Sequence, residues 1–262
     1  MRFFRALIPA LLVLTMLAAP APSNAAVSVG ISVGFAPPEL PVYDQPPIPG
    51  PGYIWMPGYW AYGPGGYYWV PGTWVLPPSV GLYWTPPWWD WNGSAYLFHA
   101  GYWGPSVGYY GGINYGFGYF GSGYEGGRWD HGRFFYNREM NNFGDRRIGN
   151  VYNEPRRHEA PDNHVAFHGG VGGMPGQPNT QERAAAAARH LQPTVPQTQH
   201  FSTARSNPAL LHTNNHGQPP IPATNRAGRF NNAGVVTAAH GQAPQHGGQP
   251  KGGGQPKGRN PG

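Results

Sequence analysis

The tryptophans of this chain occur in regularly spaced pairs, and their type and spacing could form a binding surface. Planar rings left in water stack on sugar rings or meet another protein surface, because a contiguous apolar patch usually marks an interaction site. We therefore predict an aromatic binding platform for a polysaccharide or another protein, formed by Trp55, Trp60, Trp69, Trp74, Trp84 and Trp89. The competing interpretation is core packing. The chain has few leucines and isoleucines, and an aromatic side chain buries roughly 150–250 Å².

Other residues that could carry chemistry are scattered. The chain has no cysteine, and the acidic pair considered for catalysis, Glu125 and Asp130, lies in a glycine-rich stretch without a sign of the cleft that paired catalytic carboxylates need. His164 and His168 have the spacing of metal ligands on a helix, but Pro161 before them and glycines after them argue against that helix. We expect a protein that is not an enzyme, with no catalytic residue, no dedicated metal site and no cofactor; weak scavenging of divalent metal is the alternative.

The tryptophans belong to a phrase, W-x-x-G-x-W, that recurs about every fourteen or fifteen residues. Its first two copies, residues 55–60 and 69–74, are nearly identical. Weaker copies follow at 84–89, where proline takes the glycine position, at 98–103, where phenylalanine leads, and at 113–116 and 129–134. A short repeat of this period predicts strands joined by turns.

Within one unit the two tryptophans are five positions apart, so a regular strand would point them to opposite faces. An extra residue at the Pro-Gly dipeptide, a β-bulge, would return both rings to one side; a type II turn is the alternative. Turn signals between units lie at 63–66, 77–81 and Asn92-Gly93. The pattern predicts an all-β fold, an antiparallel meander of about six aromatic-rich bulged strands.

Five segments follow from the composition. Residues 1–25 have the charged start, apolar run and small-residue exit of a signal peptide, with cleavage after Ala25. The other segments are an N-terminal strand at 26–35, a proline-rich extended connector at 36–52, the repeat domain at 53–154 and a tail at 155–262. In the repeat domain, the aromatic-glycine alternation of 115–119 favours a strand over a flexible loop, and 133–137 predicts a closing edge strand.

The tail is rich in histidine, glutamine, asparagine, glycine and proline, and its few large apolar side chains predict disorder. The exception is a short helix at 180–192, with Thr180 as its cap and Pro193 as its stop. The tail also holds most of the basic residues, whereas 26–127 contain no lysine or arginine. Without basic residues among the rings, we expect no specific nucleic-acid binding, although the tail could touch an anionic membrane surface.

The units at 53–60 and 67–74, each Tyr-x-Trp-x-Pro-Gly-x-Trp, closely resemble the YXWGXW (also called WXXGXW) repeat family of exported bacterial proteins. The glycine-rich continuation at 100–119 and the tail phrases at 206–210 and 215–217 are similar to weaker features of the family. Pro87 departs from the family's glycine and puts a regular third bulge in doubt. The resemblance implies an envelope setting and supplies no catalytic residue.

These observations together predict a non-enzymatic envelope protein, located in the periplasm, at the outer membrane or outside the cell. Its aromatic sheet would bind a surface polysaccharide or an envelope protein, with the tail as a tether. One alternative is a structural protein that self-associates through exposed strand edges. A second is an outer-membrane-associated β protein. After the N-terminal run, no stretch approaches the roughly twenty apolar residues of a membrane-spanning helix.

Overall fold

The computed structural model describes residues 30–159, 163–231 and 235–236, and it is mainly β, as the repeat predicts. The predicted signal peptide and the first residues of the predicted N-terminal strand lie outside the described residues. The strands in chain order are β1 (Ser32–Val33), β2 (Ile54–Met56), β3 (Tyr59–Gly63), β4 (Gly66–Val70), β5 (Gly72–Val75), β6 (Tyr83–Thr85), β7 (Trp88–Trp91), β8 (Tyr96–His99), β9 (Tyr102–Gly104), β10 (Asn114–Gly116), β11 (Tyr119–Phe120), β12 (Gly127–Asp130), β13 (Arg133–Asn137), β14 (Val151–Tyr152), β15 (Phe167–His168), β16 (Ala223–Thr224) and β17 (Val235–Val236). The helical segments are α1 (Thr180–Ala187), α2 (Val195–Arg205), the 3₁₀ helix η1 (Pro208–Leu210) and α3 (His212–Asn215).

The first two repeat units form one long antiparallel hairpin, which we call repeat hairpin 1 (residues 54–75). Strand β2 pairs with β5 and β3 with β4 in one continuous register, with Trp55 opposite Trp74 and Trp60 opposite Trp69. The two Pro-Gly dipeptides face each other and interrupt both strands at the same level. Neither strand gains a residue, so the predicted bulge is wrong. Proline has no N–H to donate, and both strands therefore stop pairing where the prolines stand.

The third and fourth units repeat this arrangement as repeat hairpin 2 (residues 83–104). Strand β6 pairs with β9 and β7 with β8, so that Trp84 lies opposite Trp103 and Trp89 opposite Phe98. The turn falls at Asn92-Gly93, as predicted, and the Asn92 side chain accepts the N–H groups of two turn residues. The weaker repeat copies therefore keep the geometry of the strong ones.

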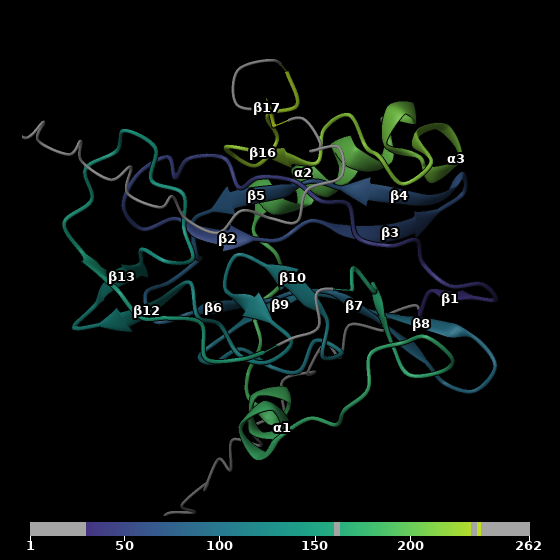
Figure 1. Ribbon diagram of the computed structural model, residues 1–262, viewed down its shortest axis with the longest axis horizontal. Coiled ribbons are helices and arrows are strands. Elements are labelled where there is room, and N and C mark those ends of the chain that lie inside the picture. Colours follow the sequence, from purple (N-terminus) through teal and green to yellow (C-terminus); the bar gives the residue numbers. More distant parts are fainter. Residues whose placement is uncertain (1–29, 160–162, 232–234, 237–262) are drawn as a thin grey trace, which may run out of the picture.

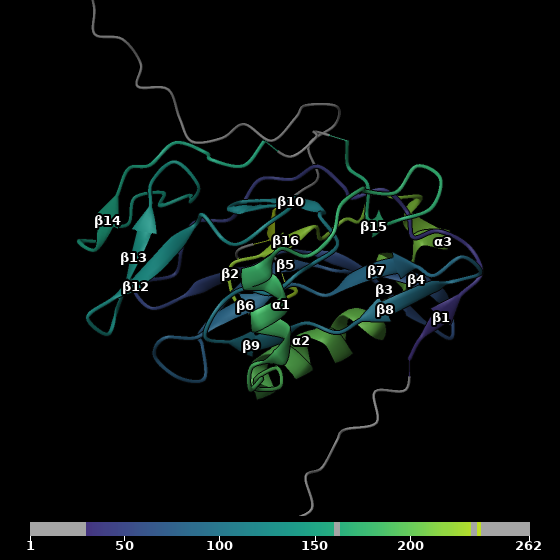
Figure 2. The same ribbon diagram turned by 90° about the horizontal axis from the view of Figure 1, so that it is seen from below.

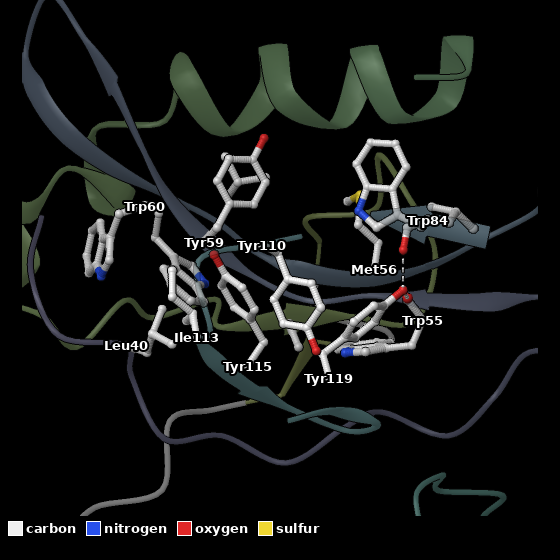
Figure 3. Close-up of a cluster of buried hydrophobic side chains, with 14 of the residues drawn as sticks. Leu40, Trp55, Met56, Tyr59, Trp60, Trp84, Tyr110, Ile113, Tyr115 and Tyr119 are labelled. Atoms are coloured by element: carbon white, nitrogen blue, oxygen red, sulfur yellow. Dashed lines mark hydrogen bonds between the residues drawn. The ribbon is translucent and has the colours of Figure 1, made fainter. Parts of the chain in front are cut away.

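The two repeat hairpins lie as two layers, hairpin 1 above hairpin 2 in Figure 1, with β12 and β13 at one end in both views (Figures 1 and 2). Between the layers the Trp89 indole donates to the Trp60 carbonyl at 2.8 Å, and Tyr59 stacks on Phe98. Figure 3 shows rings of both hairpins meeting tyrosines of the segment 110–119. The core is therefore built from aromatic rings.

Strands from outside the repeats extend the hairpins, so the fold is not one meander sheet. Strand β1 pairs antiparallel with β8, whereas β15 pairs parallel with β7 and β16 parallel with β5. These added strands come from the two flanks of the repeat region. The sequence flanks are therefore part of the folded unit.

The glycine of the repeat makes room for a tryptophan of the facing strand. A Cβ on Gly72 would lie 2.6 Å from Cζ2 of Trp55, and a Cβ on Gly101 would lie 2.5 Å from Cζ2 of Trp84. Contacts this short do not occur between real atoms, so no larger residue fits without displacing the ring. The phrase W-x-x-G thus encodes a contact between two units, with the ring of one unit lying on the glycine of the other.

Pro87 and Phe98 depart from the repeat together. Pro87 stands in the glycine position of the third unit, and the leading position of the facing fourth unit holds phenylalanine instead of tryptophan. The Trp84 ring, which leads the third unit, lies on the glycine of the fourth unit, Gly101. By the same arrangement, the Phe98 ring, which leads the fourth unit, is expected to lie on residue 87 of the third. We infer that the smaller ring compensates for the larger residue, because cores tolerate swaps that conserve volume.

This compensation predicts coupling in a double-mutant cycle. Phe98→Trp alone is expected to lower the free energy of unfolding by about 1–3 kcal/mol through overpacking. The double variant Phe98→Trp, Pro87→Gly should lose about 1 kcal/mol less stability than the sum of the losses of the two single variants. Urea denaturation of the four proteins measures this coupling, and additive losses would contradict the inferred contact.

Where the prolines interrupt strand pairing, some backbone N–H and C=O groups have no partner on the facing strand. Other parts of the chain form hydrogen bonds to these groups. The Gly58 N–H donates to the Tyr43 hydroxyl at 3.1 Å, and the Gly72 N–H donates to the Pro222 carbonyl at 3.0 Å. In hairpin 2 the carbonyls of Trp84 and Pro87 accept from tyrosine hydroxyls of the segment 110–119. Buried backbone groups are costly when unpaired, so each interruption fixes a distant segment in place.

Three of the predicted segments differ from expectation. The proline-rich segment, predicted as an extended connector between domains, packs on the core, where Leu40, Tyr43 and Ile48 are buried. Residues 115–119 form a tight hairpin of β10 and β11 instead of one strand, with Phe117 and Gly118 at positive φ in the turn. Strand β13 lies between β12 and β14 and is therefore central, not an edge. For the connector and for β13, contacts with residues outside the segment override the local pattern.

The predicted disorder of the tail is wrong for residues 163–231, which are folded. Helix α1 ends at Ala187, and its cap is Asn179, whose side chain accepts from Glu182 N–H in a capping box. The sequence pattern missed α2 altogether. Its side chains reach both hairpins: Gln197 accepts the Trp103 indole N–H at 2.7 Å, and His200 bonds to the Pro71 carbonyl at 2.8 Å. The polar residues that suggested disorder serve as buried hydrogen-bonding partners.

His200 makes the stability of the fold depend on pH. It is fully buried; Nε2 donates to the Pro71 carbonyl, and Nδ1 accepts the Gly228 N–H at 3.0 Å, which requires the neutral imidazole. Burial lowers the pKa of His200 from 6.5 to about 4, against a smaller opposing effect of the bond to Pro71. The unfolded chain therefore binds a proton more readily than the folded chain between these pH values.

The stabilisation due to neutral His200 is complete above pH 6.5 and is lost as the pH falls toward 4. We expect this residue to account for a loss on the order of 3 kcal/mol across that window. Urea denaturation at pH 7.5, 6.0, 5.0 and 4.5 measures it. The control is His200→Gln, which can still donate to Pro71 and does not titrate. If the stability of His200→Gln falls with pH as steeply as that of the wild type, groups other than His200 cause the pH dependence.

Candidate binding cleft

The predicted aromatic platform is buried. Trp55, Trp60, Trp69, Trp74, Trp84 and Trp89 are each exposed by 2% or less. Their indole N–H groups face protein as well; those of Trp60 and Trp74, for example, donate to the carbonyls of Glu39 and Pro46 in the connector. The prediction that these six rings form an exposed platform is therefore wrong. The second hairpin layer, the connector and the C-terminal segment together cover the faces that an isolated meander would leave in water.

The other sequence candidates have structural roles. Glu125 is buried and accepts the backbone N–H groups of Arg157 and His158, so it is not paired with Asp130. Asp130 instead contacts His131 at the surface. His168 lies in β15 and its Nδ1 is 3.1 Å from the Tyr109 hydroxyl. Among the residues that the structure describes, no three histidine or acidic side chains are grouped as metal ligands.

A cleft of about 550 Å³ lies between the start of the connector and the end of α3. We call it the Phe35 cleft, since the Phe35 ring at its edge is 57% exposed, whereas Leu40 and Tyr67 are buried. The volume is in the range of small-molecule sites. Its full lining is Phe35, Ala36, Pro38, Glu39, Leu40, Tyr67, His212, His216, Gly217 and Gln218.

Repeat hairpin 1 holds the connector side of the cleft. The Tyr67 hydroxyl donates to the Phe35 carbonyl at 2.9 Å, and the Trp60 indole donates to the Glu39 carbonyl at 2.9 Å. The Phe35 ring meets the edges of two rings, with centroids 5.5 Å from Tyr67 and 6.1 Å from Tyr62. The repeat rings thus position the exposed ring without being exposed themselves.

The opposite wall is α3 and the turn after it. This helix packs against β4 (Figure 1), and His212 lies edge-on to the Trp60 ring, with centroids 5.5 Å apart. His216 ends the helix in the left-handed conformation, and its N–H donates to the His212 carbonyl at 2.8 Å. This cap places two imidazoles and the Gln218 amide on one rim.

The cleft combines an apolar ring with polar groups that can bond to hydroxyls. Burial, and then the proximity of His216, lowers the pKa of His212 from 6.5, so His212 is neutral at pH 7 and can both donate and accept. Burial and its tyrosine neighbours raise the pKa of Tyr67 well above 10, so its hydroxyl stays protonated. Such a site suits a ligand with flat apolar faces and several hydroxyl groups.

The repeat hairpin also identifies the chain. The WXXGXW repeat family matches residues 50–75, with two copies. The chain is a WXXGXW-repeat protein. The matched residues are repeat hairpin 1, and the structure shows that hairpin 2 of this WXXGXW-repeat protein has the same pairing. No curated protein and no solved structure matches the chain. None of the helices in the described part of the chain has the length and hydropathy needed to cross a bilayer.

Sequence reasoning missed the cleft because its walls are far apart along the chain. Phe35 ends the predicted N-terminal strand, and His212 and His216 lie in the tail that was predicted to be disordered. The one local signal was an aromatic residue placed two positions before a pair of prolines.

Proposed function

We propose that this WXXGXW-repeat protein is an exported, non-enzymatic protein of a bacterial envelope that binds a saccharide chain in the Phe35 cleft. The observation that carries the proposal is the 57% exposed Phe35 ring, held by buried rings beside hydrogen-bonding side chains. A pyranose offers C–H groups on its faces and hydroxyls at its edge, which match the ring and the polar rim respectively. The buried tryptophans support the cleft as its scaffold.

Saccharide binding predicts a specific loss on removing the ring. Phe35→Ala should weaken binding of the best glycan by about tenfold, or about 1.4 kcal/mol, with the unfolding midpoint almost unchanged because the ring is exposed. A glycan array of cell-wall and capsular oligosaccharides selects the ligand, and titration calorimetry measures the affinity.

Val80→Ala is the matched control, since Val80 is an apolar side chain exposed by 65% outside the cleft. Equal affinities for Phe35→Ala and the wild type would contradict the cleft as the site. No binding to any glycan, together with light scattering that rises with concentration, would favour self-association instead.

Export is a separate part of the proposal and rests on the N-terminal signal pattern. Cell fractionation followed by N-terminal sequencing tests it, with Ala26 expected as the first residue. An intact Met1 on the mature protein would overturn it.

A further inference from the structure

The Phe35 cleft has a local charge opposite to that of the whole protein. The chain carries a formal net charge of +6, but the lining contains no lysine or arginine and one carboxylate, Glu39. Within the described residues, no ion pair involves Glu39. A carboxylate in a cleft of this kind attracts a cation, because the surrounding protein focuses its field.

Two hydrogen bonds hold the peptide group that follows Glu39. Its carbonyl accepts the Trp60 indole N–H, and the next N–H, that of Leu40, donates to the His164 carbonyl at 2.7 Å. Pro37 and Pro38 stiffen the four-residue step from Phe35 to Glu39. The carboxylate is therefore presented on a fixed backbone near an exposed ring, although the glutamate itself is exposed.

A carboxylate and an aromatic ring that line the same cleft suit an amino sugar. The charge of the carboxylate attracts an ammonium group, and the ring offers an apolar surface to a sugar face. Burial lowers the pKa of the neighbouring His212, which favours the neutral imidazole and limits its repulsion of a cation. Its ring nitrogens can bond to hydroxyl groups on the same ligand.

We propose that the cleft selects saccharides that carry a free amino group, with the ammonium bound by Glu39, a sugar face on the Phe35 ring and the sugar hydroxyls on the histidine rim. The inference rests on the proposed function, because it assigns a chemical class to the saccharide bound in that cleft. It identifies Glu39 as the residue that determines specificity.

Two oligosaccharides that differ in the amine alone test the proposal. The probes are a β-1,4-linked glucosamine tetramer and its N-acetylated counterpart, titrated into the full-length mature protein at pH 6.0. The wild type is expected to bind the amine form at least about tenfold more tightly, and added salt should reduce that preference. Glu39→Gln should abolish the preference, so that the two tetramers bind with equal affinity.

Glu139→Gln, at an exposed glutamate outside the cleft, makes the same change in net charge and should keep the preference. Equal wild-type affinities for the two tetramers, or a preference that persists in Glu39→Gln, would overturn the amine selectivity while saccharide binding stands. If neither tetramer binds, the amine proposal also fails. Saccharide binding itself is tested separately, by the glycan array and by Phe35→Ala.

Discussion

Gly58→Ala is expected to lower the free energy of unfolding by about 3 kcal/mol. The added methyl group would overlap Cζ2 of Trp69 and would lie 2.9 Å from the Gly72 nitrogen. Trp69 cannot move away, because it is fully buried and its indole N–H donates to the Pro222 carbonyl at 2.9 Å. Urea denaturation monitored by tryptophan fluorescence measures the loss.

Two further variants separate this clash from a general effect of replacing glycine. Gly50→Ala places a methyl group in open space at ordinary φ and should change stability by less than about 0.5 kcal/mol. Trp69→Phe in the Gly58→Ala background should recover part of the loss, since a smaller ring leaves room for the added methyl group, as inferred for Phe98 and Pro87. If Gly58→Ala is as stable as Gly50→Ala, the repeat glycine does not serve to accommodate the ring.

Truncation after Pro193 is expected to abolish cooperative unfolding. The removed segment buries Gln197, His200 and Leu210, and it supplies the partners of the Trp103 and Trp69 indoles and of the Pro71 carbonyl. Three buried polar groups left unpaired cost about 3–9 kcal/mol, against a total stability of about 5–15 kcal/mol for a typical domain. The near-ultraviolet circular dichroism of the packed tryptophans should disappear.

Adding a peptide of residues 194–231 in trans provides the positive control, because the contacts are side-chain and edge-strand contacts that a separate chain can make. The peptide should restore the near-ultraviolet signal, whereas a peptide with Gln197→Leu and His200→Leu should not. A truncated protein that unfolds at the wild-type urea midpoint would mean that the C-terminal segment is dispensable, as its composition suggested.

The hairpins were predictable because the residues that specify their strands and turns are close together along the chain. Repeat spacing and the turns at 63–66 and Asn92-Gly93 indicated where strands begin and end, and the structure confirms those turns. The bulge was not predictable, since a Pro-Gly dipeptide fits a bulge, a turn or a paired interruption equally well. The identity of the facing residue decides among them, and a single sequence does not show which residue faces Pro57.

The candidate cleft was beyond prediction for a different reason. Its ring, carboxylate and imidazoles come from residues 35–40 and 212–218, and each segment looks like a loop when considered alone. The same holds for the tail: Gln197 and His200 suggest a solvated chain unless their partners, an indole N–H and a carbonyl freed by proline, are known. A polar segment predicts disorder only where the folded protein has no buried polar group that its side chains can bond to.

The sequence by itself determined the repeat, its strands and turns, and the aromatic nature of the core, because these depend on residue type at short spacing. Tertiary structure alone decided which rings are buried. Two stacked hairpins, covered by the connector and the C-terminal segment, hide the six tryptophans and leave Phe35 in water. Burial depends on what covers a side chain, and in this protein the cover comes from segments as far as 153 residues away.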